Sequence, residues 1–229
     1  MIVSLFMLIK DIFYSYQGEG PYVGYPQIFI RFFGCNIHCQ YCDKPDLPEQ
    51  KKKWNKKDVL TVLAPLLEKP IHSISITGGE PLLHTGAIIE LAPDLHFPLY
   101  LETNGLLPEA LEKVMPLFTY FSVDFKPGYE EKFEKFMQTL LPRIKVGALP
   151  SVFVKYVMKD YQELELLHLK KILKKINPFI PCIIQPVTPY GTIQKGPNPL
   201  ELDQAYLFLS DTLKDLRVIG QTHKLIGVK

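Results

Sequence analysis

Three cysteines stand close together in the segment RFFGCNIHCQYCD, residues 31–43, with the spacing Cys35-x3-Cys39-x2-Cys42. Thiolates this close on an irregular loop can ligate three irons of a cubane cluster, which leaves the fourth iron without a protein ligand. Structural zinc usually takes four protein ligands, and no fourth Cys or His follows at zinc-finger spacing. We therefore expect a [4Fe–4S] cluster, with zinc or buried thiols as the alternatives. Cys182 lies in an apolar run and is expected in the core.

A second polar segment, TGGEP at residues 77–81, follows directly after a run expected to form a strand. Gly78 and Gly79 lack a Cβ atom, so the backbone can approach a ligand closely and adopt unusual angles there. Backbone carbonyl groups and the Glu80 carboxylate can accept hydrogen bonds. Taken alone, the segment is equally compatible with an ordinary turn.

Short β-branched or aromatic runs alternate with stretches of helical period and must position both segments. The expected strands span residues 1–10, 27–33, 71–77, 98–103, 118–125, 151–158 and 180–185. The expected helices span residues 56–68, where Pro65 should kink or shorten the helix, the segment after His84, and residues 108–115, 130–140, 161–176 and 200–213. This alternation predicts right-handed crossovers and a mainly parallel α/β sheet. About six such units are too few for a full eight-stranded barrel, so we expect a partial (β/α)6-type barrel, with residues 1–229 as a single domain.

The composition is that of an ordinary globular protein, with 47% hydrophobic and 22% charged residues. The net charge of +2 gives no general argument for nucleic acid as a partner. The apolar run at residues 1–10 is too short to span a bilayer and lacks the features of a signal peptide. We therefore expect a cytoplasmic protein with reduced thiols and with neither a membrane nor a nucleic acid as partner.

The cysteine segment, with the aromatic Tyr41 before its last cysteine, and the TGGEP turn together resemble the radical S-adenosylmethionine superfamily. In that superfamily the open iron binds S-adenosylmethionine, and a GGEP-type turn binds the methionine amino group of this cofactor. The resemblance implies a radical SAM core and a set of S-adenosylmethionine contacts, many of them made by backbone: Tyr41, Asp43, Gly79, Glu80, Asp124, Phe125, Lys126 and Gln185.

Further motifs extend the resemblance over essentially the whole chain: YSYQGEG at 14–20, LETNG at 101–105, DFKP at 124–127, IQPV at 184–187 and QTHKLIGVK at 221–229. They are similar to those of the 7-carboxy-7-deazaguanine synthases, lyases of queuosine and deazapurine biosynthesis. The resemblance implies conversion of 6-carboxy-5,6,7,8-tetrahydropterin to 7-carboxy-7-deazaguanine with loss of ammonia. In the family a 5′-deoxyadenosyl radical takes the hydrogen at C6 of the pterin and later recovers it, so the cofactor is regenerated.

The same resemblance implies a set of substrate contacts. The guanidinium fork of Arg31 suits the substrate carboxylate, although alone it also fits a surface ion pair. Gln17 and Glu19 offer donors and acceptors for the amino-pyrimidinone edge of a pterin, with a polar turn as the alternative. The last residues are expected to fold over the substrate rather than fray. The expected contacts are Tyr16, Gln17, Gly18, Glu19, Arg31, Thr77, His223 and Lys229, the last through its terminal carboxylate.

Lys44 departs from the family pattern, which usually has a Thr there whose hydroxyl ligates Mg²⁺. A charged lysine has no acceptor and cannot replace that ligand. Either its ammonium takes the place of the metal and pairs with the substrate carboxylate, which we favour, or Lys44 points to solvent and substrate and water hold the Mg²⁺. The departure also leaves open an altered substrate.

Other functions remain as alternatives. A glycyl-radical activating enzyme shares the cysteine loop but would need a wide opening for a protein substrate. A non-catalytic iron–sulfur or zinc module would not need the TGGEP turn, and an enzyme acting directly on transfer RNA would need a larger basic patch. The basic run KKKWNKK at residues 51–57 is expected to be a solvated segment leading into a helix. It could also dock an acidic electron donor such as flavodoxin. The family is commonly homodimeric.

Overall fold

The computed structural model describes residues 6–42, 47–143, 151–191 and 193–229. Its strands form one nine-stranded sheet in the order β3-β1-β2-β4-β5-β6-β7-β8-β9. The strands are β1 Met7–Tyr16, β2 Pro26–Phe32, β3 Lys52–Trp54, β4 Ser73–Gly78, β5 Leu99–Thr103, β6 Tyr120–Phe125, β7 Val152–Met158, β8 Cys182–Pro186 and β9 Leu216–Val218. The helices are α1 Lys56–Leu67, α2 Thr85–Leu91, α3 Pro108–Val114, α4 Glu130–Leu140, α5 Glu163–Ile176, α6 Pro199–Ser210 and α7 Thr222–Leu225.

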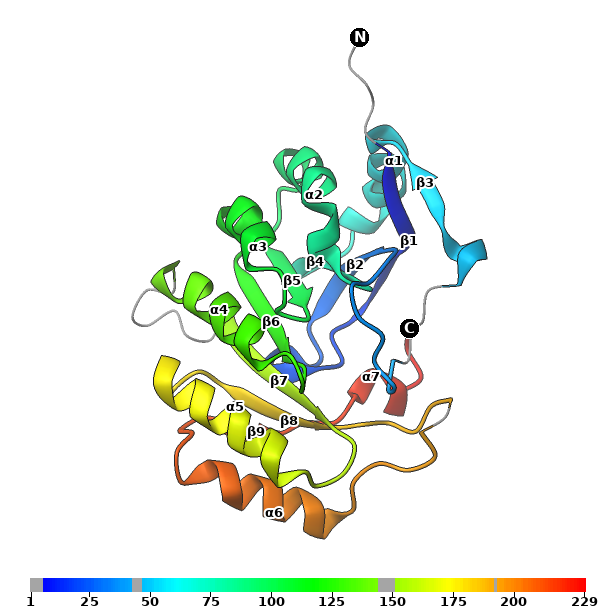
Figure 1. Ribbon diagram of the computed structural model, residues 1–229. Coiled ribbons are helices and arrows are strands. Elements are labelled where there is room, and N and C mark those ends of the chain that lie inside the picture. Colours follow the sequence, from blue (N-terminus) through cyan, green and yellow to red (C-terminus); the bar gives the residue numbers. More distant parts are fainter. Residues whose placement is uncertain (1–5, 43–46, 144–150, 192) are drawn as a thin grey trace.

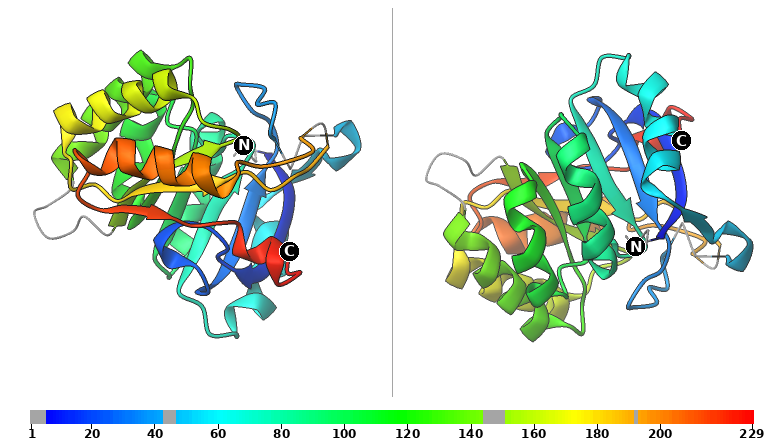
Figure 2. Two further views of the ribbon diagram at one scale, coloured as in Figure 1. Left: turned by 90° about the horizontal axis from the view of Figure 1, so that it is seen from below. Right: turned by 90° about the horizontal axis from the view of Figure 1, so that it is seen from above.

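The neighbouring strands of the run β2-β4-β5-β6-β7-β8-β9 pair in parallel, whereas β1 joins β2 and β3 in antiparallel pairs. Figures 1 and 2 show helices α2 to α5 lying side by side on the outer side of the curved sheet, in chain order. The expected α/β class, with a mainly parallel sheet and a partial barrel, is confirmed. All the described strands belong to one sheet, so we keep a single domain as our interpretation.

Apolar side chains at helical spacing pack the outer helices against the sheet. Helix α4 illustrates this, because Phe133, Phe136, Met137 and Leu140 recur on one face and are fully buried. Burying each such side chain stabilises the fold by about 1.5–3 kcal/mol. Cys182 is 0% exposed in the same core, as expected.

An aromatic cluster fills the inner side of the sheet near the amino ends of the strands. Tyr22 packs edge-on against Tyr100 and Tyr120, with ring centroids 5.8 and 4.9 Å away, and Phe153 lies beside them. A Cβ atom on Gly20, where φ is +66°, would lie 2.4 Å from the Phe153 ring. This packing fixes the loop after β1 and fills the inner space at the amino ends of the strands.

The expected elements differ from the structure mainly at the edges of the sheet. The first strand begins at Met7 and continues to Tyr16, so the first three residues of the YSYQGEG motif belong to it. Residues 1–5 lie outside the described residues. The basic segment is not merely a solvated lead into a helix, because β3 pairs with β1 and the Trp54 indole donates to the carbonyl of Ile9 over 3.0 Å. Pro65 lies in the last turn of α1, which ends two residues later at Leu67.

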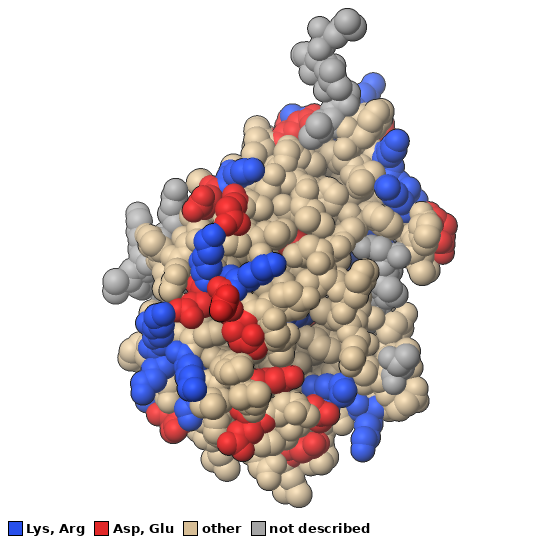
Figure 3. All heavy atoms as spheres, viewed as in Figure 1, with Lys and Arg blue, Asp and Glu red and all other residues tan. Residues whose placement is uncertain are grey.

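Strand β9 and helix α7 were not predicted, and both belong to the segment that brings the C-terminus back beside β1 (Figure 2). Figure 3 shows lysine and arginine side chains gathered on the side of the molecule where Figure 1 places β3. Within the described ranges, no helix is both long and apolar enough to cross a membrane.

Candidate active site

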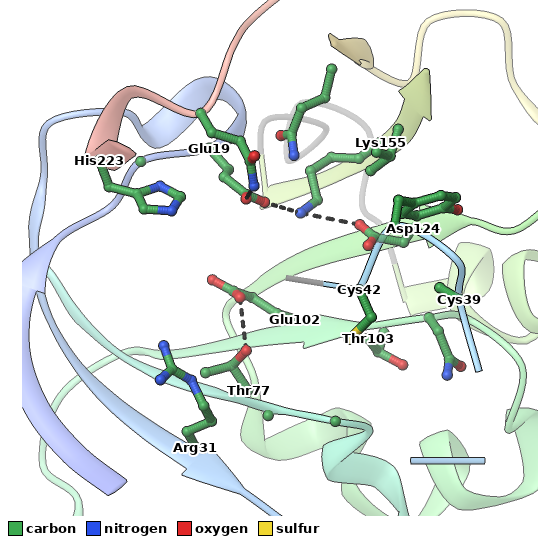
Figure 4. A pocket seen from close by; sticks show the side chains of 18 of the residues that line it. Glu19, Arg31, Cys39, Cys42, Thr77, Glu102, Thr103, Asp124, Lys155 and His223 are labelled. Atoms are coloured by element: carbon green, nitrogen blue, oxygen red, sulfur yellow. Dashed lines mark hydrogen bonds and ion pairs between the residues drawn. The ribbon is translucent and has the colours of Figure 1, made fainter. Parts of the chain in front are cut away.

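A pocket of about 430 Å³ opens at the carboxyl ends of the parallel strands, where folds of this class place their sites. It brings together residues from β1, β2, the cysteine loop, the central strands and the C-terminal segment. The expected site residues that line it are Tyr16, Gln17, Gly18, Glu19, Arg31, Cys35, Cys39, Tyr41, Cys42, Thr77, Gly79, Asp124, Lys126, Gln185, His223 and Lys229. In Figure 4, Cys39 and Cys42 lie at one end of the pocket, and Arg31 and His223 lie at the other.

The cysteine loop leaves β2 through Gly34, whose φ of +103° suits glycine. The His84 ring stacks on Phe32 at 5.0 Å and its Nε2 atom lies 2.7 Å from the carbonyl oxygen of Phe33, so the start of the loop is held in place. Partial burial raises the pKa of the Cys35 and Cys39 thiols, and these thiols must lose their protons to bind metal.

The donor set fits an iron–sulfur cluster, because three thiols on one loop face one pocket. In the described part of the chain, no three His, Cys, Asp or Glu side chains converge as ligands of a single metal ion. A cubane does not require such convergence, since each cysteine bonds to a different iron.

The turn after β4 is fixed by Gly78 and Glu80. A Cβ atom on Gly78, where φ is +141°, would lie 2.2 Å from the carbonyl oxygen of Phe32, so only glycine fits. The fully buried Glu80 carboxylate accepts hydrogen bonds from the Leu82 and Asn104 amides and from the Thr103 hydroxyl, at 3.0, 2.8 and 2.9 Å. Burial outweighs these donors and raises the pKa of Glu80 to about 7.

Glu80 is behind the pocket wall and does not line the pocket. Phe125 also does not line it, because its ring packs against Phe133 in the core at 5.1 Å. A cofactor contact at Phe125 would therefore come from its backbone, and a side-chain contact is ruled out by this packing. The expected sites Asp43 and Lys44 lie outside the described residues.

Polar groups at the cysteine end fit a bound ligand such as S-adenosylmethionine. The Lys126 ammonium pairs with Asp124 at 3.1 Å and lies 5.1 Å from the centre of the Tyr41 ring. The Gln185 side chain is 2% exposed, and its Oε1 atom has no hydrogen-bond partner among the described residues. Because unpaired buried acceptors are rare, a donor from a ligand would complete this site.

Glu102, which the sequence analysis did not assign, organises the middle of the pocket. Its carboxylate accepts hydrogen bonds from the Gln17 amide at 2.9 Å and from the Thr77 and Ser75 hydroxyls at 2.8 and 3.2 Å. The side-chain Oε1 atom of Gln17 in turn accepts from the backbone amide of Glu19 at 3.0 Å. Two expected substrate contacts are therefore held by one carboxylate, which belongs to the LETNG motif at residues 101–105.

The end of the pocket away from the cysteines carries two cations beside Phe13. Asp11 pairs with Arg31 at 3.1 Å and with the Lys229 ammonium at 2.8 Å, and both cations lie over the Phe13 ring. The Ser15 hydroxyl donates to the backbone oxygen of Lys229 over 2.8 Å. The C-terminal residue is thus anchored in the pocket wall.

His223 packs so closely against the loop after β1 that a Cβ atom on Gly18 would lie 2.1 Å from its ring nitrogen. The Thr222 backbone amide donates to the Gly18 backbone carbonyl over 2.9 Å, and the Gln221 side-chain amide donates to the Glu19 carboxylate over 2.8 Å. The QGEG turn and the C-terminal segment are therefore one packed unit.

Lys155 is the second residue that the sequence analysis missed. Its ammonium pairs with Glu19 and lies 3.1 Å from Asp124, and its side chain is 6% exposed (Figure 4). Although burial opposes ionisation, Lys155 and the Gln221 hydrogen bond lower the pKa of Glu19 to about 2. A single lysine within the buried strand VFVKYVM was the signal that could have identified it.

Comparisons with known proteins agree with this geometry. The family model of the radical SAM superfamily matches residues 29–155. The 7-carboxy-7-deazaguanine synthase of Methanothermobacter thermautotrophicus is 34% identical, over 96% of this chain and 97% of its own length. That of Geobacter sulfurreducens is 32% identical, over 96% of each chain.

Among solved structures, QueE from Escherichia coli superposes with a TM-score of 0.63 over 95% of each chain, at 18% identity, which supports the fold. The near-complete coverage by the curated relatives and the cysteine loop facing a deep pocket point to one assignment. This chain belongs to the radical SAM superfamily and, within it, to the family of the 7-carboxy-7-deazaguanine synthases.

Proposed function

We propose that this chain converts 6-carboxy-5,6,7,8-tetrahydropterin to 7-carboxy-7-deazaguanine with loss of ammonia. The observation that carries the proposal is the single pocket that joins the cysteine loop to Arg31 and the C-terminal residue. The proposal is tested by anaerobic reconstitution with iron and sulfide and incubation with the pterin, S-adenosylmethionine and a reductant. Mass spectrometry should detect the deazaguanine, and an unchanged pterin beside a fully loaded cluster would refute the proposal.

The pocket contains residues suited to the iron–sulfur cluster and residues suited to S-adenosylmethionine. Cys35, Cys39 and Cys42 would hold the cluster, while Gln185 and the Tyr41, Asp124 and Lys126 group would bind S-adenosylmethionine. The Glu80 carboxylate would attract the methionine ammonium electrostatically from behind the pocket wall. Bound together, cluster and cofactor supply a one-electron cleavage that generates a radical able to remove a hydrogen atom from the substrate.

The chain's own residues bind and orient the pterin. Arg31 offers a bidentate donor to the substrate carboxylate, and Gln17 and Glu19 face its amino-pyrimidinone edge. The packed C-terminal segment keeps water from the reacting atoms. That segment also narrows the pocket, which disfavours a protein substrate of the kind that a glycyl-radical activating enzyme needs.

The pKa of Glu80 predicts how cofactor affinity depends on pH. Because the carboxylate must be ionised to attract the methionine ammonium, we expect affinity for S-adenosylmethionine to fall on the order of tenfold per pH unit below about 7. Glu80→Gln should bind S-adenosylmethionine more weakly at pH 8 and should lose the fall in affinity at acid pH (the acid limb). Equilibrium dialysis at pH 6 and 8 can show both effects. An acid limb that persists in Glu80→Gln would contradict the assignment.

The raised pKa of Glu80 also determines how the stability of the folded protein changes with pH. The folded state holds the Glu80 proton between its ordinary pKa of 4.5 and about 7. The ligand-free protein should therefore gain stability from this group as the pH falls through that window, and should lose the gain as the pH rises through 7.

The anchored C-terminus predicts an asymmetry between tags. A tag added after Lys229 turns the terminal carboxylate into an amide. The tag would have to leave the pocket wall beside Ser15, whose hydroxyl donates to the backbone oxygen of Lys229. We expect it to reduce turnover by at least about tenfold through weaker pterin binding, whereas a tag before Met1 should leave turnover near the untagged value. Equal kcat/KM for the two tagged proteins would count against the placement of the carboxylate.

We propose that Lys44 replaces Mg²⁺ by pairing its ammonium with the substrate carboxylate. Its support is the sequence, where lysine stands at the position of the family's metal-binding threonine. The protein should then turn over without added Mg²⁺ and should respond little to EDTA. Strong activation by Mg²⁺ would remove this proposal and favour a metal held by substrate and water.

We further propose a cytoplasmic homodimer that takes its electrons from an acidic donor such as flavodoxin. The lysines around β3 are exposed, and the Lys51 ammonium lies 6.0 Å from the centre of the Phe33 ring, two residues before Cys35. Their charge complements an acidic surface close to the cysteine loop. Sedimentation equilibrium, and the salt dependence of reduction by flavodoxin, test these statements.

A further inference from the structure

Lys155 joins two parts of the pocket that are far apart in sequence. It stands on the buried strand β7, and its ammonium contacts Glu19 from the loop after β1 and Asp124 from the end of β6. Figure 4 shows the three side chains in a row between the His223 end and the cysteine end. Only 6% of the Lys155 side chain and 20% of the Glu19 side chain are exposed.

A cation buried this deeply is stable only if it is paired. The two carboxylates differ in how much they depend on it. Asp124 also pairs with Lys126 at 3.1 Å, so it keeps a cation if Lys155 is removed. Glu19 has the Gln221 side-chain amide as a hydrogen-bond donor, and His223 contributes the smallest of the charge effects that favour its ionised form. Lys155 is the strongest of the charges that favour its ionised form.

The charged groups around Glu19 come from every neighbouring element. Lys155 faces it from β7, His223 from α7, and Glu102 and Asp124 approach Lys155 from β5 and β6. Lys126 is already paired with Asp124, so the loss of Lys155 would leave Glu19 buried near Asp124 without a paired cation of its own. Such an environment opposes its charge.

We propose that Lys155 is a positioning residue that holds the Glu19 carboxylate as a fixed anionic acceptor for the amino-pyrimidinone edge of the pterin. The inference rests on the proposed function, because it needs a substrate that presents N–H donors to Glu19. The pterin edge offers an amino group and a ring N–H side by side, and two such donors fit the two oxygens of a carboxylate. Only an ionised carboxylate accepts at both oxygens, since a protonated one uses one oxygen as a donor.

The proposal has a signature in pH. In the wild type the pKa of Glu19 lies near 2, so Glu19 stays ionised at every pH in which the protein is assayed. In Lys155→Met burial remains and the paired charge is gone, so the pKa of Glu19 must rise. Pterin affinity of the variant, divided by that of the wild type, should therefore fall as the pH falls.

The experiment measures equilibrium binding of 6-carboxytetrahydropterin to anaerobically reconstituted protein in the presence of S-adenosylmethionine, at pH 8 and 5.5. The variant-to-wild-type ratio cancels the titrations that the substitution does not change, such as that of the free ligand. We expect this ratio for Lys155→Met to fall by on the order of tenfold or more between the two pH values. Lys155→Arg should restore a ratio that does not vary with pH.

Two further variants decide between positioning and a merely structural role. Lys155→Met combined with Glu19→Gln removes the titrating group, so the ratio of its pterin affinity to that of the wild type should be low and independent of pH. Lys170→Met removes a lysine paired with Asp211 at 2.8 Å on the far side of α5 and should leave pterin binding unchanged at both pH values. If Lys155→Met fails to fold, Lys155→Gln and the double variant supply the same comparison.

A Lys155→Met ratio that is equally low at both pH values would overturn the proposal, because a structural defect weakens binding at every pH. An acid limb that survives in the double variant would also overturn it. Absence of pterin binding by the wild type, with S-adenosylmethionine still bound, would instead refute the proposed function.

Discussion

Cys39→Ala should abolish the iron–sulfur cluster and with it the reductive cleavage of S-adenosylmethionine. Two thiolates cannot hold a cubane in place, and the lost ligand removes a bond to one iron outright. We expect the broad visible absorbance of the anaerobically reconstituted protein to disappear, and cleavage to fall by more than about a thousandfold. Cys35→Ala and Cys42→Ala should behave in the same way, since all three thiols line the same pocket.

Cys182→Ala is the matched control for this prediction. Cys182 is 0% exposed in the core, where burial raises the pKa of its thiol to about 12 and keeps it protonated. Its substitution should cost about 1 kcal/mol of stability and leave the iron content unchanged. Equal iron loss in Cys39→Ala and Cys182→Ala would mean that the cysteine loop does not hold the cluster.

Gly78→Ala should weaken cofactor binding because the added Cβ atom displaces the backbone of the turn after β4. An alanine Cβ atom would lie 2.2 Å from the carbonyl oxygen and 2.6 Å from the nitrogen of Phe32, which belong to the adjacent strand. Backbone atoms of a central strand cannot move aside as a flexible side chain can, so the turn that carries Glu80 must shift. We expect a loss of at least about 3 kcal/mol in the free energy of unfolding, or at least about a hundredfold in affinity for S-adenosylmethionine.

Gly24→Ala separates this steric effect from the cost of the backbone conformation. Gly24 also has a positive φ, +88°, but nothing lies within 4 Å of the Cβ atom that would be added. It should cost only about 1 kcal/mol of stability and leave cofactor affinity unchanged. Urea unfolding and equilibrium dialysis measure both quantities. If Gly78→Ala proved as mild as Gly24→Ala, the turn would not be as tightly constrained as the structure indicates.

The central elements of the fold could be predicted because their patterns are local. Strand β2 is a run of β-branched and aromatic residues, and helix α4 repeats phenylalanines at helical spacing, so each carries its own signal. Strand β3 was missed because its lysine-rich sequence resembles solvated chain. Its pairing with β1 depends on long-range contacts such as the one between Trp54 and Ile9.

In the candidate site, too, residues in local motifs could be predicted, whereas residues whose roles depend on long-range contacts could not. The cysteines and the glycine turn have residue types and spacings that are rare by chance, so the sequence singled them out. Glu102 lies within the LETNG motif and Lys155 within the apolar run VFVKYVM, but each is a single charged residue whose neighbours in sequence do not indicate what it contacts. Their importance comes from parallel pairing, which places β5, β6 and β7 side by side and turns both charges inward.

Phe125 shows the limit of reasoning from motifs. It stands between Asp124 and Lys126, which both line the pocket, but side chains alternate along a strand and its ring points to the core instead. A motif identifies a segment, and the pleat of the strand decides which of its side chains reach the ligand.

The central claim is that S-adenosylmethionine and the pterin are bound next to each other in this one pocket. Deuterium placed at C6 of 6-carboxytetrahydropterin tests it most directly, with the isotope content of recovered S-adenosylmethionine followed by mass spectrometry during turnover. Deuterium should appear in the cofactor while 7-carboxy-7-deazaguanine forms. Formation of that product with no deuterium in S-adenosylmethionine or 5′-deoxyadenosine would contradict it.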